Sequence, residues 1–156
     1  MSIRKILRIV FIALGFAVLA GVTLFVLLHW QSLPEQIPTN FDGSGHADAY
    51  GDKGNLIGLL VVSWLAWGIL SALACFPALR QRKGVFRVSL LRLGTRHIEP
   101  SPLGLALMSF VLPLIFGYVA LCSVLCRDLG VWFLPVALAA SLLSALVPTV
   151  LESLWS

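Results

Sequence analysis

Charged residues are scarce in this chain of 156 residues. They make up 12% of it, against 59% hydrophobic residues, and only seven are Asp or Glu. A typical soluble domain is about one quarter charged and not quite half apolar. This chain has too little polar surface to cover a water-soluble fold, so the composition excludes a soluble enzyme or a soluble binding domain.

Ionisable side chains are nearly absent from four apolar runs, and Arg8 at the edge of the first is the only charged residue in them. The runs cover residues 6–30, 56–76, 103–125 and 131–151. A bilayer core takes about 20 apolar residues in helical form. None of the runs alternates polar with apolar residues, which argues against a β-barrel. The sequence therefore predicts an all-α integral membrane protein of one domain, residues 1–156. It has four transmembrane helices and a compact extracytoplasmic loop, residues 31–55, between the first two.

The lack of acidic and histidine side chains deep in these runs also limits the function. Ion pathways and proton relays use such groups at depth, so a coupled transporter or a proton pump is disfavoured. Neither the paired carboxylates nor the zinc motif of an intramembrane protease is present. We expect a protein that is not an enzyme and that needs no cofactor.

Basic residues are distributed unequally between the two sides of the predicted membrane. Arg4, Lys5 and Arg8 precede or begin the first run, and residues 78–101 carry six more, whereas the other side holds only Lys53 and Arg127. Because Lys and Arg in short loops resist translocation, both termini and residues 78–101 are expected in the cytoplasm of a bacterium, at its inner membrane. This asymmetry accounts for the net charge of +4, and no nucleic-acid partner is expected.

Packing inside the membrane can also be predicted in outline. Small residues that let helices approach closely occur at Ala17 and Gly21, at Gly68 and Ala72, and at Ala137, Ser141 and Ala145. Trp64 and Trp67 lie one helical turn apart in mid-span, so we expect them to share a packed face. Ser101 followed by Pro102 predicts a capped start for the third helix.

The loop between the first two runs differs from the rest of the chain. From Leu33 to Gly54 it is rich in Gly and Pro, which favour tight turns. Four apolar side chains recur among these turn residues, and we expect them to hold the loop against the helix ends: Leu33, Ile37, Phe41 and Tyr50.

The same loop carries the candidate binding residues. They are Asn40, Asp42, His46, Asp48, Tyr50, Asp52 and Lys53. The clustered carboxylates favour a cationic partner, but each of them could instead cap a neighbouring backbone N–H group. The pattern from Asn40 partly imitates a calcium loop, without the terminal bidentate Glu. Metal binding therefore stays open.

The segment LPEQIPTNFDGSGHADAYGDKG, from Leu33 to Gly54, resembles the domain of unknown function 1648 (DUF1648), whose members carry LPxxIPxHFxxxGxxDxWGSK after a first membrane helix. The matching residues are Leu33, Pro34, Ile37, Pro38, Phe41, Gly45, Asp48, Gly51 and Lys53. Asn40 replaces the family's His, Asp52 its Ser and Tyr50 its Trp. The resemblance covers roughly the first half of the chain. It implies a relation to SdpI-type immunity proteins, which protect bacteria against a secreted peptide toxin.

Two classes of function follow from these patterns. The first is a small bacterial membrane protein whose outer loop binds a peptide, lipid or protein partner, with immunity-like protection as one form of this role. The alternative is an accessory structural subunit of a larger membrane complex. A metal-dependent membrane enzyme using the outer loop is a third and weaker interpretation. The expected partners are the lipid bilayer and either a larger membrane-protein complex or a secreted peptide.

Overall fold

A computed structural model describes residues 3–76 and 101–154 of the chain. Its helices are α1 (Ile3–His29), α2 (Asn55–Cys75), α4 (Pro102–Val124) and α5 (Phe133–Leu154), with a short 3₁₀ turn, η1 (Trp30–Ser32), after α1. In the described part of the chain, these four helices are long and apolar enough to cross a membrane. The four predicted spans are thus confirmed, and the protein is a multi-pass membrane protein. Apart from Ser101, residues 78–101, whose form the sequence left open, lie outside the described residues.

The third helix begins where the sequence predicts. Ser101 has extended backbone angles, and its hydroxyl accepts a hydrogen bond from the backbone N–H of Gly104 at 2.8 Å. Pro102 follows at the first helical position, where its missing N–H costs nothing and its fixed φ suits the helix. Serine and proline therefore set the start of α4 through local chemistry, and the hydroxyl of Thr149 in α5 accepts the backbone N–H of Ser101 at 3.2 Å.

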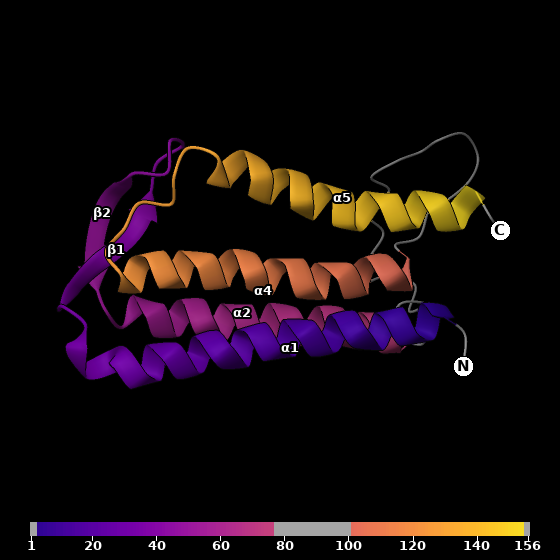
Figure 1. The fold of residues 1–156 in the computed structure, drawn as a ribbon, viewed down its shortest axis with the longest axis horizontal. Coiled ribbons are helices and arrows are strands. Elements are labelled where there is room, and N and C mark those ends of the chain that lie inside the picture. The colour runs from indigo at the N-terminus through magenta and orange to yellow at the C-terminus, as the bar shows by residue number, and fades with distance from the viewer. Residues whose placement is uncertain (1–2, 77–100, 155–156) are drawn as a thin grey trace, which may run out of the picture.

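Helix α4 lies at the centre of the bundle. It packs against α1 and α2 on one side and against α5 on the other (Figure 1). It also has the largest set of buried residues of the four helices, many of them small, such as Gly104, Ala106, Gly117 and Ala120. Small side chains let neighbouring backbones approach closely, which is the main source of helix association where lipid removes the hydrophobic drive.

The predicted small-residue contacts are confirmed only in part. Ala17 and Gly21 are exposed, and nothing in the described part of the chain lies within 4 Å of a Cβ placed at Gly21, so the predicted close approach at this face is not seen there. The packed face of α1 instead contains Gly15, where an added Cβ would lie 2.2 Å from the carbonyl oxygen of Ser109 in α4. On α5 the prediction holds for Ala145, because its carbonyl oxygen would lie 3.2 Å from a Cβ added at Gly104.

Trp64 and Trp67 share a packed face between α2 and α1, as predicted. Their rings lie 5.7 Å apart, and each lies 5.5 Å from the ring of Phe16. The indole N–H of Trp64 donates to the hydroxyl of Thr23 at 3.1 Å, and that of Trp67 donates to the carbonyl oxygen of Ile12 at 3.2 Å. The indole N–H groups of both residues have hydrogen-bond acceptors inside the bundle, so these residues have a packing role.

The all-α prediction is wrong for the loop between α1 and α2, because this loop forms a β-hairpin. Strand β1 (Gln36–Phe41) pairs antiparallel with β2 (Ala47–Asp52), with register shifts around Asn40. An isolated hairpin is marginally stable, and its strands are interrupted by Pro and Gly, so local sequence gives little strand signal. The hairpin covers the helix ends opposite the two termini (Figure 1).

Candidate functional site

The inner strand of the hairpin rests on the bundle. Leu33 is 7% exposed and Ile37 is 1% exposed, and both join an apolar cluster with residues of α1, α2 and α4. Phe41 is partly buried. Tyr50, which was expected to pack with them, is 62% exposed, so that prediction is wrong. Strand β1 contacts α4, whereas Tyr50 lies on strand β2, where its side chain is exposed.

Asp42 shapes the turn at the hairpin tip. Its carboxylate accepts hydrogen bonds from the backbone N–H groups of Ser44 at 2.8 Å and His46 at 2.9 Å. The backbone of the turn closes in addition through the N–H of Asp42 and the carbonyl oxygen of His46, 2.8 Å apart. Of the two roles considered for this carboxylate, the contacts favour capping over binding of a cationic partner.

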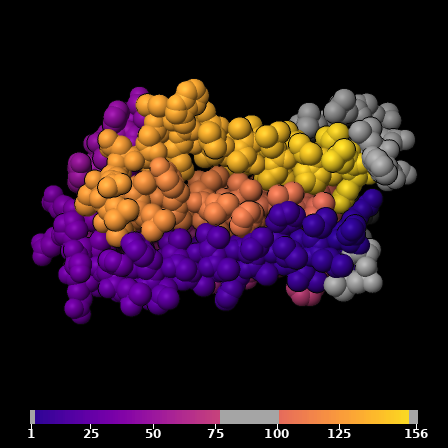
Figure 2. All heavy atoms as spheres, viewed as in Figure 1, coloured from indigo at the N-terminus to yellow at the C-terminus, as the bar shows by residue number. Residues whose placement is uncertain are grey.

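The hairpin tip docks on the connection between α4 and α5. The N–H of Leu129 donates to the carbonyl oxygen of Gly45 at 2.8 Å. Gly45 has φ +82°, and a Cβ there would lie 2.5 Å from the backbone oxygen of Gly130. Only glycine fits both the backbone angle and the contact. The tip is therefore joined to a segment more than 80 residues later in the chain (Figure 2).

Asp128 provides the side-chain part of this junction. One carboxylate oxygen lies 3.0 Å from Nδ1 of His46, and the other accepts the N–H of Ala47 at 3.0 Å. The hydrogen bond and the negative charge of Asp128 raise the pKa of His46 above its ordinary value of 6.5. The same hydrogen bond and that from Ala47 lower the pKa of Asp128. Both side chains are more than half exposed, so solvent screens the pair.

The base of the hairpin holds the remaining charged candidates. Asp52 accepts the backbone N–H of Gly54 at 2.5 Å, next to the start of α2. The ammonium of Lys53 lies 5.8 Å from the centre of the Trp30 ring, within cation–π range. The side chains of Asn40, Asp48 and Tyr50 are exposed.

The predicted binding residues therefore do not converge on one site. They divide between the tip, the base and the outer face of the hairpin. In the described part of the chain, no group of three or more His, Cys, Asp or Glu side chains could hold a metal ion. Sequence reasoning also missed Asp128. Its signal was weak but present, since it is the only acidic residue between the third and fourth apolar runs.

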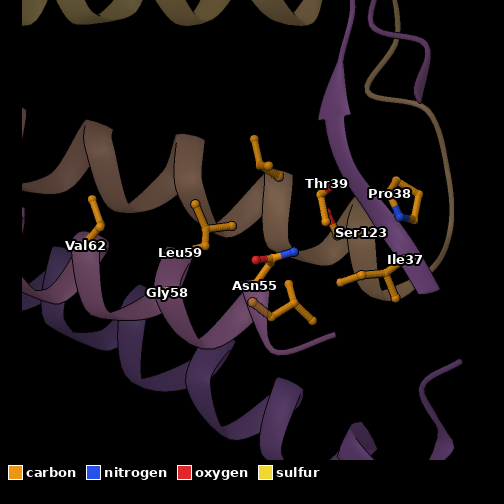
Figure 3. Close-up of a pocket in the computed structure, with 10 residues that line it drawn as sticks. Ile37, Pro38, Thr39, Asn55, Gly58, Leu59, Val62 and Ser123 are labelled. Carbon is orange, nitrogen blue, oxygen red and sulfur yellow. The ribbon is translucent and has the colours of Figure 1, made fainter. Parts of the chain in front are cut away.

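A groove lies beneath the hairpin, between β1, α2 and α4 (Figure 3). Its volume is about 500 Å³, within the range of about 300–1,000 Å³ for small-molecule sites. It is lined by Ile37, Pro38, Thr39, Asn55, Leu56, Gly58, Leu59, Val62, Val119 and Ser123. Three of these side chains are polar, and none belongs to the predicted set. Thr39, Asn55 and Ser123 come from three separate elements, so no sequence spacing connects them.

The groove changes in character along its length. Figure 3 shows Thr39, Ser123 and Asn55 near the hairpin, while Leu59 and Val62 follow along α2, farther from it. One end thus offers hydroxyl and amide groups, and the other offers hydrocarbon side chains alone. Such a gradient can bind a molecule with a polar end and an apolar tail.

Comparison with known proteins gives one family match, which lies in the first part of the chain. No curated protein and no solved structure gives a significant match. Residues 10–64 match the family model described as Domain of unknown function (DUF1648). The match covers most of α1, the hairpin and the first half of α2, and it ends before α4. The chain is accordingly a membrane protein whose residues 10–64 are similar to the DUF1648 family.

Proposed function

We propose that this protein binds an amphipathic lipid in the groove beneath the hairpin and has no enzymatic activity of its own. The groove is the observation that carries the proposal, because it joins polar groups from Thr39, Asn55 and Ser123 to an apolar wall in one cavity of about 500 Å³. Ligand sites in proteins commonly have this composition, with a few polar groups that orient a mostly apolar ligand.

The apolar part of the groove fits a hydrocarbon chain. Leu59, Val62 and Val119 line it from two membrane-length helices. Val62 is 54% exposed, so part of its surface is available to a ligand. Gly58 leaves the wall open, since nothing lies within 4 Å of a Cβ placed there. A chain lying along α2 would cover this surface.

The polar part fits the oxygen-rich linkage of a lipid. Asn55 begins α2, is exposed, and its side-chain amide makes no hydrogen bond with the described residues. An amide offers two donors and an acceptor. Among the described residues, the hydroxyl of Thr39 makes one long hydrogen bond, 3.5 Å to the carbonyl oxygen of Ala49, which leaves it available to a ligand. Ester and phosphate oxygens would accept from these groups.

Filling the groove tests the proposal directly. Gly58→Phe places a ring in open space inside the groove, and Gly21→Phe is the matched control, because Gly21 also has nothing within 4 Å but lies on α1 away from the groove. We expect Gly58→Phe to lower affinity for a fluorescent phospholipid on the order of tenfold, about 1.4 kcal/mol, with an unchanged melting temperature. Gly21→Phe should bind like the wild type.

The experiment has clear contrary results. Equal phospholipid binding by the wild type and Gly58→Phe would exclude the groove as the lipid site. Binding of a secreted peptide, with no lipid binding, would assign the site to a peptide instead. That result would support the immunity-like role implied by the DUF1648 resemblance.

A second candidate function is that of an accessory subunit in a larger membrane complex. It rests on Ala13, Ala17 and Gly21, which follow one another at intervals of four residues on α1 and are all exposed. Small residues at this spacing allow another helix to approach closely. Under this alternative, Gly21→Phe would abolish co-purification of a stoichiometric partner from native membranes. Under the lipid-binding proposal it would change nothing.

The proposed setting is the inner membrane of a bacterium, with the termini in the cytoplasm and the hairpin outside. The basic-residue asymmetry supports this orientation, because Arg4, Lys5 and Arg8 lie at the end of the bundle that holds the termini. In this setting the groove would receive a lipid from the outer leaflet.

A further inference from the structure

A second and smaller pocket lies at the other end of the bundle. Its volume is about 200 Å³, enough for several water-sized groups. Arg4, Lys5 and Arg8 line it from α1, Pro102 and Leu103 line it from the start of α4, and Glu152 lines it from α5. Three helices thus bring three cations and one carboxylate together around a single cavity.

Within residues 3–76 and 101–154, no carboxylate forms an ion pair with the cations of this pocket. Among the described residues, the only ion pair within 4.0 Å is His46 with Asp128, at the opposite end of the bundle. Glu152 therefore forms no ion pair with the three cations around it. Three positive charges and one negative charge leave the pocket with a net charge of two positive, which favours an anion.

Arg8 is held in a fixed position within this group. Its Nη1 atom donates to the carbonyl oxygen of Ala74, near the end of α2, at 3.1 Å. A guanidinium has five N–H donors, so this contact leaves others for a ligand. Arg4 and Lys5 are exposed. The first turn of α4 adds the partial positive charge of a helix N-terminus on the same side of the cavity.

We propose that this pocket binds the phosphate group of an anionic phospholipid. Several cations around a small cavity at a helix start match the charge and size of a phosphate. A lipid is the source because the pocket lies at the end of membrane-length helices, at the depth of lipid headgroups. Apolar side chains for its tails lie on the same turns of α1, where Ile6 is 43% exposed and Leu7 is 40% exposed.

The test compares lipids on the full-length protein in detergent by native mass spectrometry. Phosphatidylglycerol should bind more tightly than phosphatidylcholine. The double variant Arg4→Gln with Lys5→Gln should weaken phosphatidylglycerol binding roughly 30-fold, from the usual contribution of a cation near an anionic lipid surface. Arg8 is left intact because it also holds α2. Glu152→Gln, which removes the opposing charge, should strengthen binding.

Arg127→Gln is the control for a loss of positive charge elsewhere, because Arg127 is exposed in the α4–α5 connection at the opposite end. It should leave phosphatidylglycerol binding unchanged. Unchanged binding in the Arg4 and Lys5 double variant, or equal binding of the two lipids, would overturn the proposal. Displacement of phosphatidylglycerol by millimolar inorganic phosphate would overturn the choice of a lipid and identify free phosphate as the ligand.

Discussion

Asp128 joins the hairpin tip to the connection between α4 and α5 with both of its carboxylate oxygens. Gly45 makes the same junction through its backbone, where any side chain would meet Gly130. Asp42 serves the turn itself by accepting two backbone N–H groups. At this scale, Asp42, a carboxylate that the sequence offered for ligand binding, is used to hold the backbone, and Asp128, which the sequence did not single out, does the same. The groove beneath β1 therefore depends on residues that do not line it.

The pair of His46 and Asp128 predicts a pH dependence of hairpin docking. The folded-state pKa of His46 is raised above 6.5. Protonated His46 therefore stabilises hairpin docking fully below pH 6.5, and this stabilisation is lost as the pH rises through the folded-state pKa. The folded-state pKa of Asp128 is lowered below 3.8, so its stabilisation is present above that pH and is lost as the pH falls through the lower value. Docking should be tightest between about pH 4 and 6.5.

Nuclear magnetic resonance titration of His46 measures this effect. Asp128→Asn should lower the pKa of His46 and remove the weakening of hairpin docking above neutral pH. Asp48→Asn is the control, because Asp48 is exposed on strand β2 and forms no hydrogen bond or ion pair with His46. An unchanged His46 titration in Asp128→Asn would show that the two side chains do not interact in solution.

At the scale of elements, glycines decide which faces of the helices meet. Gly15 faces α4 so closely that a Cβ would lie 2.2 Å from the carbonyl oxygen of Ser109 and 3.0 Å from the ring of Trp67. Gly21, on the same helix, meets nothing within 4 Å. Of these two glycines, only Gly15 is needed for α1 and α4 to pack. The difference depends on the face of α1, because both residues look alike in the sequence.

We expect Gly15→Ala to destabilise the bundle by about 2 kcal/mol, since overpacking of a close contact typically costs 1–3 kcal/mol. Gly21→Ala, the matched control, should leave stability unchanged or raise it slightly, because alanine is the better helix former. Unfolding of each variant in mixed micelles of increasing denaturing detergent gives the comparison. Equal unfolding of the two variants would contradict the close approach of α1 and α4.

At the scale of the whole molecule, the two candidate sites lie at opposite ends of the bundle. The groove is lined by β1, α2 and α4, and the basic pocket is lined by the starts of α1 and α4 and the end of α5. Figure 1 shows these last helix ends at the side of the bundle away from the hairpin. Helix α4 contributes to both, through Val119 and Ser123 at one end and through Pro102 and Leu103 at the other. One central helix therefore supports two lipid sites in opposite leaflets under our proposals.

The orientation of the whole molecule can be tested in intact cells. In a variant in which Cys75, Cys122 and Cys126 are replaced by Ser, Ser44→Cys at the hairpin tip should react with a membrane-impermeant maleimide. Lys5→Cys should be protected until the cells are opened, because basic residues keep that end in the cytoplasm. Strong labelling at position 5 with protection at position 44 would reverse the orientation.

The sequence by itself determined the class of the protein and much of its outline. Four apolar runs with almost no charge dictate membrane helices, because the backbone has no other way to satisfy its polar groups in lipid. Ser101 with Pro102 set the start of α4 by local chemistry. Leu33 and Ile37 were recognisable as anchors because apolar residues among turn formers need a surface to cover.

Tertiary structure decided the sites. The hairpin forms on the end of the bundle, and its docking depends on Asp128 and Gly130, far away in the chain. The sequence also did not show which apolar helix faces pack against each other. Gly15 meets α4 closely and Gly21 meets nothing within 4 Å, yet both lie in the same apolar run, because lipid-facing and protein-facing positions use the same residue types. The groove takes Thr39, Asn55 and Ser123 from three elements. No local pattern links residues whose distance is fixed only when helices and strands pack.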